Sequence, residues 1–263
     1  MDKKTPKGRV DARLVEAAAA RRERLASSFE AIDLLDRTME DLVRANAGRL
    51  RMSGPAHAVL AAAFGKALKT LDAIRIASES GYGEDAMILA RSLVNLAINL
   101  GYIGRALDPD ERARDFVAAG RVARRDFLRH FPQHDPDWGK EVDWPALEER
   151  AKRWDGARIR KRAIEAKMED FYREFYCFGS SYEHSDSASL GGYFGASDEN
   201  NQEIDSDPSD DLVNLVIGCT FKAMAVLTEI LVAAFNLSEE ERLATLRAAF
   251  AQLGTERLPA AEG

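Results

Sequence analysis

The sequence predicts an all-α fold: a single-domain multi-helix bundle of about seven to nine helices with one long polar loop. Apolar residues recur at helical spacing, as in Ile32, Leu35, Met39, Leu42 and Val43. Residue patterns typical of helix starts stand before several such runs. No stretch of useful length alternates apolar and polar residues as a half-buried strand does, and no repeat period indicates a solenoid.

The first part of the chain divides into helices at clear boundaries. Residues 10–26 are rich in Ala and Arg and predict a helical arm, and a helix over residues 28–48 follows. A Gly-Pro pair at residues 54–55 begins the next helix, because proline suits the first helical position. The turn Gly-Tyr-Gly at residues 81–83 ends it, and a strongly apolar helix is expected over residues 84–105.

The second part shows further helix starts and two loops. Asp108, Pro109 and Glu111 supply a cap, a proline and an acid at the start of a helix that reaches about Arg129. The remaining expected elements are a loop over residues 131–145, a long charged helix over 146–184, the polar loop over 185–208, a helix over 209–236 and a last helix that starts at the capping box 238–241.

These elements predict a helical arm over residues 1–27, a helical core over residues 28–237, and a C-terminal helix with a flexible tail over residues 238–263. The net charge of −7 means that the surface as a whole does not attract nucleic acid. The N-terminus lacks the apolar segment of a secretory signal. Charged residues interrupt the two most apolar stretches, so core helices of a cytoplasmic protein are expected, with no membrane partner.

Four polar residues, Tyr172, Tyr176, Ser180 and His184, follow one another at intervals of four in the sequence. Because a helix turns by about 100° per residue, the last three share one face of the predicted helix. Gly179 lies inside this run, where it either permits another helix to approach closely or begins the unwinding of its own helix.

A second polar line lies on the apolar helix over residues 84–105. Arg91, Asn95 and Asn99 are four apart, and Tyr102 follows three residues later. A buried arginine needs partners, because an unpaired buried charge costs several kcal/mol. We therefore expect the two polar lines to face each other, with Arg91 buried and bonded to a polar group of the helix that carries His184.

Both segments resemble a family of uncharacterised, mostly bacterial helical proteins known only as a domain of unknown function. The matching residues are Arg91-Ser92-Leu93, Asn95 and Tyr102-Ile103, then Tyr176, Ser180 and His184, and the resemblance covers roughly residues 30–235. Many relatives have Glu at the position of Asn95, so an acid, base or metal-ligand role is not expected there. The resemblance implies an all-α fold and a shared pocket, without an agreed activity.

The predicted site is a polar pocket between helices that binds a small anionic or carbonyl ligand. Arg91, Asn95, Asn99 and Tyr102 are the expected ligand-binding residues; Tyr176 and Ser180 would orient the ligand, and His184 would donate or accept a proton. The loop over residues 185–208 would cover the entrance. A purely structural reading stays open, in which these side chains only bond one another and fix helix register.

Metal and cofactor chemistry is not expected. The four histidines, His57, His130, His134 and His184, stand in no metal-binding motif, and no phosphate loop or dinucleotide fingerprint is present. The two cysteines, Cys177 and Cys219, lie in apolar runs and are expected to be buried free thiols. Whether the protein is an enzyme stays open.

Two other functions remain open. Arg129 and His134 have the Arg-x4-His spacing of a superfamily of helical ribonuclease toxins, and residues 121–130 and 150–167 are basic, which suggests a defence- or toxin-type protein acting on nucleic acid. Acidic residues interrupt the second basic stretch, which favours a solvated helix face there. Pro132 inside that motif should end the helix, which favours a loop instead. The alternative of a non-catalytic, homo-oligomeric interaction or regulatory protein rests on Val10, Leu14, Val15 and Ala18, apolar residues of the arm that could dock on a second subunit.

Overall fold

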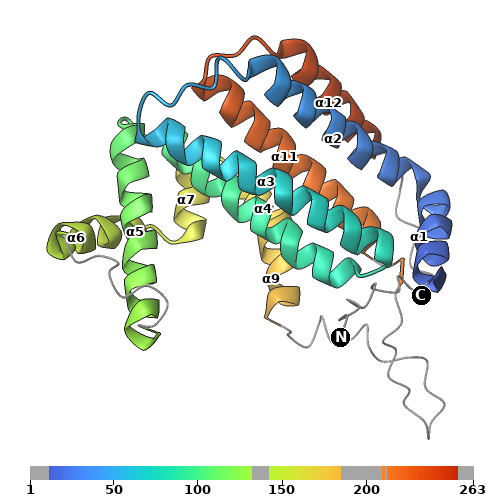
Figure 1. The fold of residues 1–263 in the computed structure, drawn as a ribbon, viewed down its shortest axis with the longest axis horizontal. Helices are drawn as coiled ribbons and strands as arrows, with labels where there is room; N and C mark the ends of the chain where they lie inside the picture. Colours follow the sequence, from blue (N-terminus) through green and yellow to red (C-terminus); the bar gives the residue numbers. More distant parts are fainter. Residues whose placement is uncertain (1–11, 132–141, 185–208, 211, 254–263) are drawn as a thin grey trace, which may run out of the picture.

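The computed structural model describes residues 12–131, 142–184, 209–210 and 212–253, with side chains from residue 15 onward. The described residues form helices and no strand, and they pack into a single helical body (Figure 1), so the all-α prediction is confirmed. The predicted polar loop over residues 185–208 lies outside the described residues. The helices are α1 (Ala12–Arg24), α2 (Ala26–Asn46), α3 (Pro55–Ser80), α4 (Gly83–Gly104), α5 (Pro109–His130), α6 (Trp144–Asp155), α7 (Ile159–Glu165), α8 (Glu169–Phe171), the π-helix η2 (Tyr172–Tyr176), α9 (Cys177–Glu183), α11 (Val213–Ala234) and α12 (Glu240–Leu253).

The two most apolar helices, α4 and α11, form the centre of the body. Helix α4 packs against both α3 and α11, and α11 in turn packs against α2 and α12. Both helices are long and apolar enough to cross a membrane by composition, but 67% of the most apolar window of α4 and 61% of that of α11 are buried inside the body. This burial is what core helices of a bundle show, as the interrupting charges predict.

Short capping contacts fix the turns around α3 and α5. Gly81 adopts a left-handed conformation (φ 84°) after α3, and the amide of Tyr82 donates to the carbonyl of Ala77 at 2.9 Å, which closes the helix end. Asp108 accepts from the amide of Glu111 at 2.9 Å, so the predicted start of α5 is confirmed. Asp110 also accepts from the first turn of α3 at 2.9 Å, and it thereby ties the starts of two helices together.

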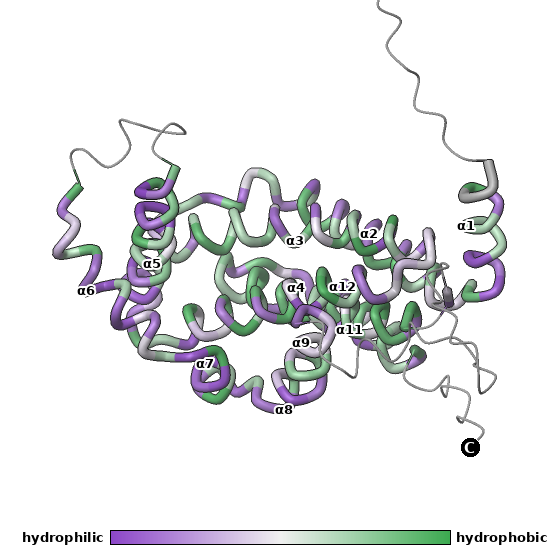
Figure 2. Tube along the Cα trace, turned by 90° about the horizontal axis from the view of Figure 1, so that it is seen from below, coloured by the Kyte–Doolittle hydropathy of each residue, from purple (hydrophilic) through white to green (hydrophobic). Residues whose placement is uncertain are grey.

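Helices α5 and α6 pack against each other at one end of the body, while α1 lies at the other end (Figures 1 and 2). The buried carboxylate of Asp115 on α5 holds the pair together. It accepts from Arg153 at 2.7 and 3.1 Å and from Arg150 at 3.3 Å. These two residues of the basic stretch over residues 150–167 therefore face α5 instead of forming a free basic surface.

The prediction of one long helix over residues 146–184 is wrong. The chain forms α6, α7, α8, η2 and α9 instead, and Figure 2 shows α7, α8 and α9 along one face of the body. The turns occur at Gly156 and at Lys167, whose φ of 56° is a left-handed conformation that ends α7. Breaking the helix allows the small residues Ala157, Ala163 and Ala166 to be buried in the core, which a straight helix would not permit.

Arginines of α1 bind the arm to its own chain. Arg21 is buried; its Nε donates to Asp210 at 2.6 Å and its Nη1 to the carbonyl of Glu79 at 2.9 Å. Arg24 donates to the same carboxylate of Asp210 at 2.8 Å. Of the apolar arm residues, Val10 and the side chain of Leu14 lie outside the described part, and Val15 is 55% exposed. Docking of the arm on a second subunit therefore stays a prediction, as do the domain boundaries.

Candidate functional site

Arg91 is buried, and its guanidinium bonds to three residues of the segment Tyr176–Glu183. Its Nε donates to Oγ of Ser180 at 3.0 Å, and its Nη2 donates to the hydroxyl of Tyr176 at 2.8 Å. Its Nη1 forms an ion pair with Glu183. The Arg91 side chain is only 10% exposed, so the prediction that a buried arginine of α4 meets the Tyr-Ser helix is confirmed.

Gly179 makes this meeting possible. A Cβ built on Gly179 would lie 2.8 Å from Cβ, 3.2 Å from Cγ and 3.3 Å from Cδ of Arg91, so any larger residue would force α9 away from α4. Of the two roles considered for Gly179, close approach of another helix is thus the one the structure supports. The π-helix η2 directly precedes α9, and within it the rings of Tyr172 and Tyr176 stack at 5.1 Å.

Ser180 and Tyr176 use their oxygens differently. The Ser180 hydroxyl accepts from Arg91 and donates its own proton to the carbonyl of Tyr176 at 2.9 Å, so its hydrogen-bonding capacity is largely used inside the protein. A nucleophilic serine needs a base in that place. The Tyr176 hydroxyl accepts from Arg91, and no hydrogen bond among the described residues uses its proton.

His184 follows the last residue of α9 at the surface, and no hydrogen bond in the described part of the chain joins it to Arg91. Its side chain is 71% exposed, and its Nε2 lies 3.7 Å from the carboxylate of Glu183. Glu183, one residue earlier, instead supplies the charged partner of Arg91. Sequence reasoning missed Glu183. Among the described residues, the imidazole of His184 reaches the cluster only through this carboxylate, which already pairs with Arg91.

Asn95 and Asn99 continue the polar line along α4, but they meet a second arginine. Nδ2 of Asn99 donates to Oδ1 of Asn95 at 3.0 Å, and Oδ1 of Asn99 accepts from Nη1 of Arg162 at 2.9 Å. Arg162 comes from α7, and its Nη2 donates to the carbonyl of Trp154 at 2.9 Å. Arg162 belongs to the basic stretch over residues 150–167, which was expected to form a solvated helix face, so its internal contacts were not predicted.

The charge of Arg162 is poorly compensated. Its hydrogen-bond acceptors among the described residues are an amide oxygen and a backbone carbonyl, both neutral, and its buried Nε has no partner there. Burial lowers the pKa of Arg162, and the negative charge of Asp155 acts against this change. The guanidinium lies 4.0 Å from the centre of the Trp154 ring, which supplies part of the missing stabilisation.

Tyr102, the fourth expected ligand-binding residue, lies in a different environment. It is buried; its ring packs at 5.5 Å against the Trp154 ring, and the guanidinium of Arg112 lies 3.9 Å from its centre. The ring of Phe116 also packs against the Trp154 ring, with 4.9 Å between the ring centres. Tyr102 thus contributes to the aromatic packing that joins α4, α5 and α6, next to the partner of Arg162.

The histidines and cysteines show no cluster that could hold a metal ion within the described residues. His57 bridges Ser53 at 2.7 Å and the carbonyl of Ala234 at 3.0 Å, which ties α3 to the end of α11. Cys219 is buried, and burial raises its pKa to about 12. Cys177 is exposed, so the prediction that both thiols are buried is wrong for this one, because it lies on the outer side of α9.

The toxin-like pair is only partly described. Arg129 lies in the last turn of α5, is exposed, and pairs with Asp126 at 3.4 Å, while His134 lies outside the described residues. α5 ends at His130, two residues before Pro132, as that proline predicts. A function on nucleic acid stays a prediction.

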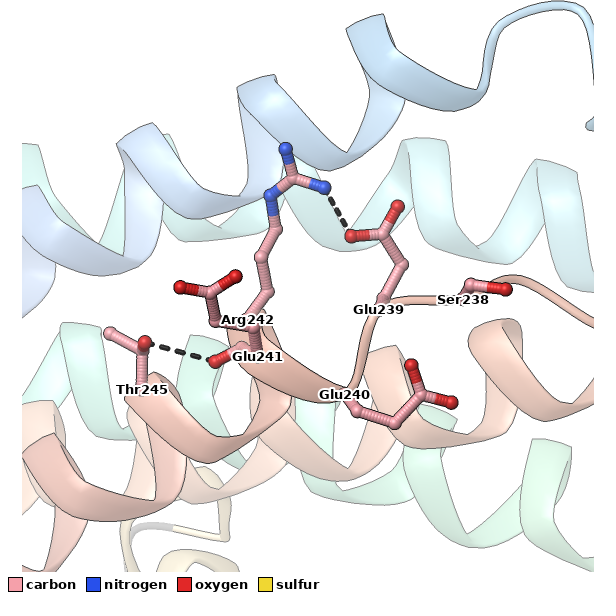
Figure 3. A pocket seen from close by; sticks show the side chains of 6 residues that line it. All are labelled: Ser238, Glu239, Glu240, Glu241, Arg242 and Thr245. Atoms are coloured by element: carbon pink, nitrogen blue, oxygen red, sulfur yellow. Dashed lines mark hydrogen bonds and ion pairs between the residues drawn. The ribbon is translucent and has the colours of Figure 1, made fainter.

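A separate depression lies at the start of α12, away from the polar line of α4. It has a volume of about 630 Å3 and is lined by residues 238–242 and Thr245 (Figure 3). The buried carboxylate of Glu239 accepts from Asn46 at 2.5 Å and pairs with Arg242. These bonds use the carboxylate to fasten α12 to α2, so the depression offers mainly the exposed acids Glu240 and Glu241.

Comparison with known proteins assigns the chain to a family. Neither the search of curated proteins nor that of solved structures found a match. The sequence profile of DUF5677, described as a family of unknown function, matches residues 57–203, a shorter range than the resemblance suggested. The match includes Arg91 and the whole Tyr176–Glu183 segment, and it covers more than half of the 263 residues. The chain therefore belongs to DUF5677, a family of unknown function.

Proposed function

We propose that this protein binds a small molecule with an anionic or carbonyl group at the polar line formed by α4, α7, η2 and α9. The proposal rests on the hydrogen-bonding groups of this polar line that have no partner among the described residues. Among the bonds of the described residues, Nδ2 of Asn95 and the proton of the Tyr176 hydroxyl are unused, and both are donors. Free donors favour a ligand that presents acceptor oxygens.

The surrounding charge supports the same ligand class. Arg91 and Arg162 lie on either side of the Asn95–Asn99 pair, and a single carboxylate, Glu183, pairs with them among the described residues. Half-buried Arg162 is destabilised by desolvation, so a negative charge nearby would relieve it. Asn95 and Asn99 are only partly buried, which leaves this side of α4 open to a ligand.

We propose ligand binding at this site without a chemical reaction. Ser180 already donates its proton to a carbonyl, and His184 lies at the exposed rim, so neither is arranged as a nucleophile and base. We place the protein in the cytoplasm, which the burial of the two apolar helices supports.

The test compares small molecules that co-purify with two matched variants. Arg162→Leu removes the half-buried cation, whereas Arg247→Leu makes the same chemical change at a residue that is 65% exposed on α12. The purified proteins are denatured, and the released compounds are identified by untargeted mass spectrometry. We expect a carboxylate, phosphate or carbonyl compound from the wild type and from Arg247→Leu, and little of it from Arg162→Leu.

Two results would contradict the proposal. Equal amounts of the compound from Arg162→Leu would mean that it binds elsewhere on the protein. Wild-type protein that releases nothing beyond the buffer blank would mean that the polar line is a structural network.

A further inference from the structure

The three nitrogens of Arg91 have partners of two kinds. Nε and Nη2 donate to the hydroxyls of Ser180 and Tyr176, which are neutral and come from within the helical segment. Nη1 pairs with the carboxylate of Glu183, the last residue of the seven-residue helix α9. The two neutral bonds hold the guanidinium in place, so its orientation does not depend on Glu183.

The ion pair joins a buried cation to an accessible anion. The Arg91 side chain is 10% exposed, whereas that of Glu183 is 39% exposed. Pairs that reach the surface contribute little net stability, because water solvates the carboxylate well once it is released. Arg91 cannot follow it into solvent, so an opened pair leaves a fixed guanidinium N–H that lacks an anionic acceptor.

We propose that Glu183 occupies the place of a ligand carboxylate. The inference rests on the proposed function and adds two statements to it: the anionic group of the ligand is a carboxylate, and it binds Nη1 of Arg91 after Glu183 turns to solvent. Glu183 then acts as an internal competitor that lowers the affinity of the site for carboxylates. A ligand that fills Nη1 and also uses the donors of Asn95 and Tyr176 overcomes this competition, while an anion without those contacts does not.

The experiment uses propionate, which has the same carboxyl group as a glutamate side chain. Propionate and, separately, inorganic phosphate are titrated at constant ionic strength into the full-length 15N-labelled protein, and the backbone amide signals of α4 and α9, which every variant retains, are followed by NMR. Glu183→Gln removes the competing charge with little change of shape. Glu229→Gln is the matched control, because Glu229 is 41% exposed and pairs with Arg247, so it has a similar exposure and also an arginine partner.

We expect Glu183→Gln to bind propionate about twofold to fivefold more tightly than the wild type, in line with the modest strength of a partly exposed ion pair. Glu229→Gln should match the wild type. Adding Arg91→Gln to Glu183→Gln should abolish the gain, and far-UV circular dichroism checks that this double variant is folded.

The outcomes separate the two proposals. Equal propionate affinity in the wild type and Glu183→Gln overturns the role of Glu183 and leaves ligand binding at the polar line intact. A gain that persists in the double variant overturns it as well, since the anion then binds away from Arg91. Tighter binding of phosphate than of propionate overturns the carboxylate class. If no variant binds either anion, this inference falls, while the proposed function is decided by the compounds that co-purify with the wild type and with Arg162→Leu.

Discussion

The packing of α9 on α4 through Gly179 gives a sharp prediction for Gly179→Ala. The new methyl group would lie 2.8 Å from Cβ of Arg91, which is attached directly to the backbone of α4 and cannot move aside alone. Overpacking of this kind costs about 1–3 kcal/mol. The change from glycine to alanine inside a helix returns about 1 kcal/mol. We therefore expect a net loss of up to about 2 kcal/mol of unfolding free energy.

Gly65→Ala is the matched control for this experiment. Gly65 lies in the middle of α3, and a Cβ built there meets nothing within 4 Å, so only the helix-propensity gain remains. It should stabilise the protein by about 0.5–1 kcal/mol. Urea unfolding followed by circular dichroism measures both variants. If Gly179→Ala stabilises the protein as much as Gly65→Ala does, α9 does not pack against Arg91 as described.

Three further predictions follow from single contacts. A double-mutant cycle between Arg91→Ala and Glu183→Ala in urea unfolding should give a favourable coupling of about 0.2–1 kcal/mol, and a coupling of zero or of opposite sign would contradict their ion pair. One of the two thiols should react with a thiol reagent at pH 8 in the native protein and two after unfolding, because burial raises the pKa of Cys219 to about 12; two native thiols would contradict its burial. The hydrogen bond from Arg24, and after it that from Arg21, lowers the pKa of Asp210. These bonds therefore stabilise the fold fully above the ordinary pKa of 3.8, and the stabilisation is lost as the pH falls through the lowered pKa of the native state. Asp210→Asn should remove this part of the acid dependence of unfolding, and an unchanged profile would contradict it.

The helices of the first half could be predicted because their boundaries are local. Asp108 caps its own helix at Glu111, and the glycines around residue 82 end one helix and begin another. The segment over residues 146–184 failed because its breaks are not local. Lys167 in a left-handed conformation has no sequence signature, and the alanines that follow Trp154 are buried in the core. Helix propensity alone favours a continuous helix there.

Burial energetics located Arg91, whereas no comparable argument pointed to Arg162. Arg91 lies in an apolar helix, so its need for internal partners was evident from the sequence. Arg162 lies among charged residues that resemble an exposed face, and only the break before α7 turns it toward Asn99. A basic residue in a charged stretch carries no mark of burial until the path of the backbone is known.

Helix geometry explains why Glu183, and not His184, is the charged partner of Arg91. Steps of four residues drift by about 40° each, so a residue eight positions after Tyr176 is turned by about 80° from it. A residue seven positions after Tyr176 is turned back by only about 20°. Glu183 therefore lies closer to the face of Tyr176 than His184 does. The contacts of Arg91 agree, because it bonds to Tyr176 and to Glu183. In an i, i+4, i+8 series of polar residues, only the first two lie close to one helix face, and the residue at position i+7 lies nearer to that face than the one at i+8.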